Sequence, residues 1–368
     1  MEIPMLNISN AKYYDDDALK YAKGIAIADG KITSIEDAEA LDAEYLAVPG
    51  FIDLQIYGAG GRLFSAKPTI ESLTIMEDDL LKKGTTGFLA CMATNSPEVF
   101  KECIKTAKSF AKQARNFLGL HLEGPYLNPK RLGAHVPEFV SKATLEEVKS
   151  LLDLGDGVIK MMTIAPECQD EKVIQYLLDH DVLVSLGHSD ASFKEATSAY
   201  DRGIKTTTHL FNAMSPIHHR QPGIPTAFFN HPKAMSSIIV DGEHLDYEVV
   251  KLAYKLSKGR LFLITDAVTP CDIAPYQHIE RDNKFVMPDG TLSGSSLTML
   301  KALQNCVRHC DIPLHEAIKM TSLYPGKLIG AHEHLGQIKV GSKANLLLLN
   351  KELKLQQVIF RGESISTK

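Results

Sequence analysis

The sequence has no apolar run long enough to cross a membrane, few cysteines and no concentration of basic residues. No run approaches the ~18 apolar residues of a membrane span, and the first residues lack the basic and apolar regions of a secretory signal. We therefore expect a cytoplasmic protein with no membrane partner. Lysine and arginine are scattered and the formal net charge is −5, so the electrostatic footprint of nucleic-acid binding is missing.

Two further motifs are missing. The six cysteines are widely spaced and none forms Cys-x-x-Cys, which argues against a thiolate zinc site or a disulfide framework. No Gly-x-Gly-x-x-Gly follows the first predicted barrel strand, which argues against dinucleotide binding. The chemistry must therefore come from other residues.

The two ends of the chain show the same sequence pattern. Residues 1–48 alternate short apolar runs with turn signals, including Asp29-Gly30 between two such runs, a pattern typical of a hairpin. Residues 335–368 also alternate short apolar runs with turn signals. Because terminal β segments that flank a long middle region most simply pair with each other, we expect one discontinuous, small β-sandwich domain.

The middle region, 49–334, alternates strand and helix signals. Asp246, for example, precedes an amphipathic segment as a predicted N-cap. Eight alternating apolar strands favour an α/β fold, a closed (β/α)8 TIM-like barrel, over an open sheet. The predicted strands are Phe51–Gln55, Thr86–Cys91, Phe117–Leu122, Val158–Ile164, Val182–Leu186, Lys205–His209, Ser236–Val240 and Leu261–Thr265.

Polar side chains stand where these strands end. In a barrel such positions converge on one mouth, where catalytic groups of this fold gather. Two imidazoles and a carboxylate from this set suit a Zn²⁺-like ion with open positions for water, and a second carboxylate is left as a base. Any one of these residues alone is more often structural, so the hypothesis depends on their coincidence. The residues are Gln55, Glu123, His188, His209, Asp266 and, just after the seventh strand, His244.

Loops at the same face carry further candidates. His135 follows the third strand, and Arg220 follows the sixth. An arginine there suits bidentate recognition of phosphate, and the backbone amides of Asn212 and Ala213 could donate to the same anion. Either side chain could instead be an ordinary solvated loop residue.

Short sequence motifs along the whole chain resemble those of a known protein family. The chain resembles the N-acetylglucosamine-6-phosphate deacetylase family of the amidohydrolase superfamily. The motifs are Pro49-Gly-Phe-Ile-Asp53, His121-Leu-Glu-Gly-Pro-Tyr126, Ala165-Pro-Glu167, Gly187-His-Ser, Thr208-His-Leu-Phe-Asn-Ala-Met, Asp241-Gly-Glu-His244, Thr265-Asp-Ala and Gly294-Ser-Ser-Leu-Thr-Met299.

The resemblance implies metal-dependent removal of the N-acetyl group from N-acetylglucosamine 6-phosphate. It implies one divalent ion per subunit held by Glu123, His188 and His209: zinc, with iron, cobalt and manganese as other suitable ions. Asp266 would be the acid and base, and His244 would contact the acetyl carbonyl. The sugar phosphate would meet Ala134, His135, Asn212, Ala213, Leu292, Ser293 and Gly294, and Arg220 would reach it from the neighbouring subunit of a homodimer.

The end of the first strand departs from the family pattern. Many superfamily members have His-x-His there, which helps bind a second metal, and other deacetylases of the family have Gln-x-Asn, whereas this chain has Gln55-Ile-Tyr57. Gln55 is therefore predicted to lie beside the metal without binding it, and one metal is predicted, not two. Two alternatives stay open: a deacetylase of N-acetylgalactosamine 6-phosphate and a non-catalytic sugar-phosphate-binding homologue.

Overall fold

The structure is a computed structural model that describes residues 6–39, 42–282 and 284–366. The N-terminal residues 1–5, where no secretory signal was expected, lie outside the described residues. The chain divides into two compact units. One comprises Met1–Asp53, Asp78–Gly87 and Thr298–Lys368, and the other comprises Leu54–Glu77 and Phe88–Leu297. The domain limits expected from the sequence, 1–48 with 335–368 and 49–334, stay a prediction.

The first unit contains a seven-stranded mixed sheet built from both ends of the chain. Its order is β19 (Glu363–Ile365), β18 (Leu355–Phe360), β17 (Leu346–Leu349), β4 (Tyr45–Pro49), β1 (Leu6–Asp15), β2 (Ala18–Ala28) and β3 (Lys31–Ala38). Only β1 and β4 pair in parallel. As predicted, Asp29 and Gly30 make the β2–β3 hairpin turn, since Ala28 pairs with Lys31.

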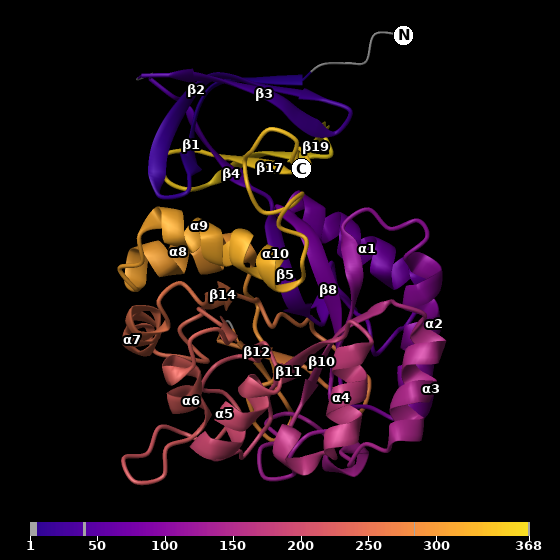
Figure 1. The fold of residues 1–368 in the computed structure, drawn as a ribbon. Coiled ribbons are helices and arrows are strands. Elements are labelled where there is room, and N and C mark those ends of the chain that lie inside the picture. Colours follow the sequence, from indigo (N-terminus) through magenta and orange to yellow (C-terminus); the bar gives the residue numbers. More distant parts are fainter. Residues whose placement is uncertain (1–5, 40–41, 283, 367–368) are drawn as a thin grey trace. The chain divides into compact units, whose positions relative to one another are not determined.

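The β2–β3 hairpin is hydrogen-bonded to the segment that precedes β17. Ile32 donates its backbone N–H to Ser342 at 3.0 Å, and Ala344 donates to Gly30 at 2.8 Å. Buried apolar side chains from both ends of the chain, among them Ile25 and Leu346, pack into one core cluster. This unit also contains the helices α8 (Met299–His309), α9 (Leu314–Thr321) and α10 (Leu323–Leu328) (Figure 1).

The second sheet is the expected barrel. Its parallel order is β14 (Leu261–Leu263), β13 (Met235–Ile238), β12 (Thr206–Thr207), β11 (Leu183–Leu186), β10 (Ile159–Ile164), β9 (Phe117–Glu123), β8 (Thr85–Ala93) and β5 (Phe51–Ile56). Ile56 bridges in parallel to Ala267, which follows β14, so the two ends of this order meet. A strand is present at each of the eight predicted places, but the last three are shorter than predicted: β12 covers only Thr206–Thr207, β13 ends at Ile238 and β14 ends at Leu263. Every residue of β5 is buried, as strands covered on both faces require.

Helices follow the barrel strands. They are α1 (Ile70–Lys82), α2 (Pro97–Phe110), α3 (Leu145–Gly155), α4 (Glu171–Asp179), α5 (Phe193–Asp201), α6 (Ile224–Asn230) and α7 (Tyr247–Ser257), and Figure 1 shows α2 to α7 around the strands. Asp246 caps α7 as predicted, since its side chain accepts from the backbone of Glu248. Short elements complete the unit: β6 (Gly58–Ala59), β7 (Arg62–Leu63), β15 (Ile279–Arg281), β16 (Lys284–Val286) and the 3₁₀ turns η1 (Pro137–Phe139) and η2 (Pro166–Cys168).

Over the described residues, no helix is long and apolar enough to span a membrane. All six cysteines are free thiols, and four of them are buried.

Candidate active site

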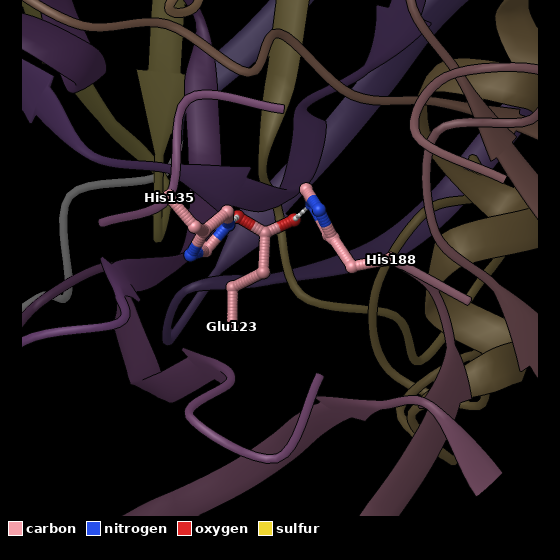
Figure 2. A group of neighbouring side chains, drawn as sticks. All are labelled: Glu123, His135 and His188. Carbon is pink, nitrogen blue, oxygen red and sulfur yellow. Dashed lines mark hydrogen bonds and ion pairs between the residues drawn. The ribbon is translucent and has the colours of Figure 1, made fainter. Parts of the chain in front are cut away.

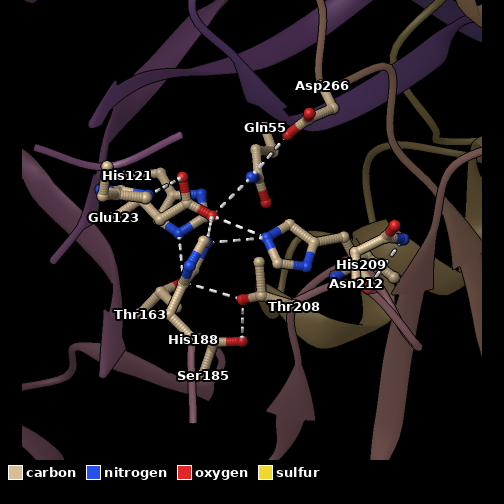
Figure 3. Close-up of polar contacts among 12 residues, drawn as sticks. Gln55, His121, Glu123, Thr163, Ser185, His188, Thr208, His209, Asn212 and Asp266 are labelled. Carbon is tan, nitrogen blue, oxygen red and sulfur yellow. Dashed lines mark hydrogen bonds and ion pairs between the residues drawn. The ribbon is translucent and has the colours of Figure 1, made fainter. Parts of the chain in front are cut away.

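The polar residues predicted at the strand ends lie together at one cavity. Glu123 ends β9, His188 and His209 follow β11 and β12, and Asp266 follows β14. All four are at least 90% buried. Figure 3 shows their side chains converging, with Gln55 between Glu123 and Asp266. The convergence predicted from the barrel pattern is therefore present.

The backbone turns sharply at three of these residues. The φ angles are 46° at His188, 33° at His209 and 55° at Asp266. This left-handed region is sparsely used by residues other than glycine, and such conformations cluster at functional sites. All three of these residues line the cavity.

Three ligand atoms form a compact triangle. Glu123 Oε1 lies 3.0 Å from His209 Nε2 and 3.3 Å from His188 Nε2, and the two nitrogens are 3.1 Å apart. Atoms at these spacings can all bind one ion at the usual distance of ~2.0–2.2 Å. Two nitrogens and one oxygen are a donor set that suits divalent zinc, iron, cobalt or manganese.

The protonation of His188 also fits a metal ligand. Its Nδ1 lies 2.9 Å from the backbone oxygen of Arg131. Since a carbonyl can only accept, Nδ1 carries the proton, and the lone pair of Nε2 faces the triangle. Such a hydrogen bond on the outer nitrogen is what orients most metal-binding histidines.

His135 is a third histidine beside Glu123 and is buried, although its loop position alone predicted a surface residue (Figure 2). Its ligand atom lies within 4.8 Å of those of Glu123 and His188, so distance alone would admit it as a metal ligand. The backbone N–H of Thr94, 3.3 Å from its Nδ1, can only donate. Nε2 therefore carries the proton and donates to Glu123 Oε2 at 3.2 Å. Burial lowers the pKa of His135 to about 4, so the ring is neutral.

Gln55 and Tyr57 connect the two carboxylates. Gln55 Nε2 lies 2.9 Å from Glu123 Oε1, 2.8 Å from Asp266 Oδ1 and 3.0 Å from the Tyr57 hydroxyl. The Tyr57 hydroxyl donates to Glu123 Oε2. Pairing of the first strand with the segment after the last strand brings these residues together, because Asp266 N donates to the Gln55 backbone oxygen at 3.0 Å.

Glu123 and Asp266 have different surroundings, which shift the pKa values of their carboxyl groups in opposite directions. Burial opposes the ionisation of Glu123, but its close contacts with His188, His135 and His209 hold its pKa well below the usual range. Burial raises the pKa of Asp266; His244 opposes that rise and the charge of Glu123 adds to it. A carboxyl group poised in this way beside an ionised one is typical of acid–base chemistry.

His244 is oriented toward Asp266 by a neighbour. Its Nδ1 donates to Asp241 Oδ2 at 2.6 Å, and its Nε2 lies 3.8 Å from Asp266 Oδ2. Asp241 also accepts from the backbone of Glu243 and His244. Burial opposes the ionisation of Asp241, but these hydrogen bonds lower its pKa, so the pair stays fixed.

The cavity has a volume of about 290 Å³, the size of a small-molecule site. Arg220 is exposed on its loop and does not line it. The predicted residues that line the cavity are Glu123, Ala134, His135, His188, His209, Asn212, Ala213, His244, Asp266, Leu292, Ser293 and Gly294.

Two residues of the cavity wall were not predicted from the sequence. Tyr276 and His278, from the loop after β14, line the cavity. Tyr276 donates to the backbone oxygen of Thr94 at 2.5 Å, and His278 Nδ1 lies 3.0 Å from Ser293 Oγ. Burial lowers the pKa of His278 to about 4. No strand-end pattern marks this loop; the only available signal was its aromatic and histidine content.

Comparisons with known proteins agree with this geometry. The model of the amidohydrolase family matches residues 46–365. An N-acetylglucosamine-6-phosphate deacetylase from Haemophilus influenzae is 34% identical, over 85% of each chain. An N-acetylgalactosamine-6-phosphate deacetylase from Escherichia coli O157:H7 is 28% identical, over 93% of this chain and 94% of that one.

The fold is also similar to that of a solved structure. It is a mutant N-acetyl-D-glucosamine-6-phosphate deacetylase from Mycobacterium smegmatis in complex with N-acetyl-D-glucosamine-6-phosphate. Its TM-score is 0.90 at 26% identity, over 98% of this chain and 99% of that chain. With a family model matched over most of its length and close relatives along nearly all of it, the chain belongs to the amidohydrolase family.

Proposed function

We propose that the protein hydrolyses the N-acetyl amide of N-acetylglucosamine 6-phosphate to glucosamine 6-phosphate and acetate. One observation carries the proposal: Glu123, His188, His209 and Asp266 converge in a single buried cavity of an amidohydrolase whose relatives are named as deacetylases of this substrate.

The amidohydrolase family implies a divalent metal ion. In this chain Glu123 Oε1, His188 Nε2 and His209 Nε2 would hold it, since these three atoms are mutually 3.0–3.3 Å apart. A bound ion lowers the pKa of a coordinated water toward ~7 and polarises a carbonyl group. We propose one ion per subunit and zinc as the native metal.

Asp266 would carry the proton. It accepts a proton from the attacking water as the C–O bond forms, and returns it to the amide nitrogen as the C–N bond breaks. Gln55 donates to Asp266 Oδ1 at 2.8 Å and keeps the carboxylate in place, which leaves Oδ2 facing His244. The acid and base steps thus use a single carboxyl group.

His244 would bind the acetyl oxygen. Its Nδ1 donates to Asp241 Oδ2 at 2.6 Å, which aims Nε2 at the cavity near Asp266. Nε2 donates to the acetyl oxygen when the ring carries a proton on both nitrogens. A donor fixed at the place where negative charge develops stabilises the transition state without reorganising.

The other end of the substrate would lie among the backbone and small side chains of Asn212, Ala213, Ser293 and Gly294. Remote contacts to a phosphate hold the reacting carbon in place and so contribute to rate as well as affinity. The proposed Arg220 contact requires a homodimer, because Arg220 does not line the cavity of its own subunit. A contact from His135 to the phosphate stays a prediction, as does the cytoplasmic location.

The test is acetate release from the 6-phosphates of N-acetylglucosamine and N-acetylgalactosamine by the metal-loaded protein. We expect N-acetylglucosamine 6-phosphate to react with the higher kcat/KM. The galactosamine alternative is favoured by the Escherichia coli relative, and a reversed preference would establish it. Release from neither compound would favour the non-catalytic sugar-phosphate-binding homologue.

A further inference from the structure

The two oxygens of Glu123 have different partners. Oε1 lies 2.9 Å from Gln55 Nε2 and faces His188 Nε2 at 3.3 Å and His209 Nε2 at 3.0 Å. Oε2 instead meets two hydrogen-bond donors, the Tyr57 hydroxyl and His135 Nε2 at 3.2 Å. A carboxylate can bridge two metal ions only if each oxygen keeps a lone pair free for one of them. Oε1, with Gln55 Nε2 as its one N–H donor, keeps a lone pair for a metal ion, whereas the two donors on Oε2 occupy both of its lone pairs.

Tyr57 is the donor that ties this arrangement to the first strand. Its ring is buried in an apolar cluster with Leu63, Val268 and Tyr276, which fixes where the hydroxyl can lie. The hydroxyl accepts from Gln55 Nε2 at 3.0 Å and donates to Glu123. A protonated phenol offers a metal little more than a weakly basic oxygen, whereas soft or charged donors bind divalent transition ions well.

We propose that Tyr57 is a positioning residue that limits the centre to a single metal ion. Its hydroxyl holds Glu123 Oε2 as a hydrogen-bond acceptor, so that Oε1 alone is left to bind the metal. His135 acts with it from the opposite loop. The inference rests on the metal site of the proposed function and adds the reason why that site takes one ion.

The test measures zinc binding to the full-length protein without substrate. Metal equivalents after equilibrium dialysis are determined by plasma mass spectrometry, and the dissociation constant by competition with a chelator. We expect one equivalent for the wild type. Tyr57→Phe should keep one equivalent but bind it about 10-fold more weakly, as for other residues that orient a metal ligand.

Two further variants distinguish the effect of Tyr57 from that of Gln55. Gln55→His alone should still bind one equivalent, because Tyr57 continues to hold Glu123 Oε2. Gln55→His with Tyr57→His supplies two imidazoles and removes the phenol, and should bind two equivalents. Tyr276→Phe is the matched control: this buried hydroxyl in the same cavity donates to Thr94 instead of Glu123, so its loss should leave zinc affinity unchanged.

Several results would overturn the inference. They are two equivalents in the wild type or in Gln55→His, one equivalent in a double variant whose circular dichroism is native, or wild-type affinity in Tyr57→Phe. Since no substrate is present, these outcomes are independent of acetate release. Zinc binding as expected without deacetylation would contradict the proposed function and leave the role of Tyr57 standing.

Discussion

Asp266 is the residue on which turnover depends most in this account. Asp266→Asn keeps the size of the side chain and its place beside Gln55 but cannot take up a proton. We expect kcat for acetate release to fall by about 10²–10⁴-fold, with zinc content unchanged by plasma mass spectrometry. Near-normal turnover in this variant would remove Asp266 from the mechanism.

His188 should instead be needed for the metal itself. His188→Ala removes a nitrogen from the triangle with Glu123 and His209, so the purified variant should contain little zinc. His180→Ala is the control, since His180 is exposed at the end of α4 and its loss should leave the zinc content at the wild-type value. Equal zinc in both variants would exclude His188 as a ligand.

His278 should make stability depend on pH. Its pKa is lowered by burial from 6.5 to about 4, so between these values the unfolded state binds more protons than the folded state. Stability is therefore full above pH 6.5 and declines as the pH falls toward 4, by roughly 3 kcal/mol from this group. In urea unfolding, His278→Gln should show a shallower decline than the wild type; parallel curves would contradict this.

At the scale of elements, the strands and their ends could be predicted because the signal is local. Most barrel strands are short apolar runs, and Glu123 and His188 lie where such runs stop; His209 follows β12, which is a short run of β-branched threonines. The roles of Tyr57 and His135 could not be predicted, because they depend on non-local contacts: Ile56 pairs with Ala267 across the barrel closure, and Thr94 sets the protonation of His135.

The start of α5 should contribute measurably to stability. Ser192 and Glu195 form a capping box four residues after His188, which satisfies backbone N–H groups at the helix N-terminus. Ser192→Ala should lower the free energy of unfolding by about 1 kcal/mol. Ser198→Ala, on an exposed position of the same helix, should have little effect, and an equal loss in both variants would exclude the cap as the cause.

At the scale of the whole molecule, the proposed homodimer makes each active site depend on both subunits. Arg220→Ala and Asp266→Asn should each be nearly inactive alone. When the two are co-expressed, hybrid dimers regain one intact site, so activity should rise to about a quarter of the wild-type value in a closed two-fold dimer. No gain on co-expression of soluble, dimeric variants would show that Arg220 does not act across an interface.

One metal ion, held by residues from three strand ends, is proposed to support hydrolysis of the acetyl amide. This role is tested most directly by titrating zinc into metal-free protein while acetate release from N-acetylglucosamine 6-phosphate is followed. We expect no release without zinc and a linear rise that stops at one equivalent per chain. Full activity in the metal-free protein, or a rise that continues to two equivalents, would contradict it.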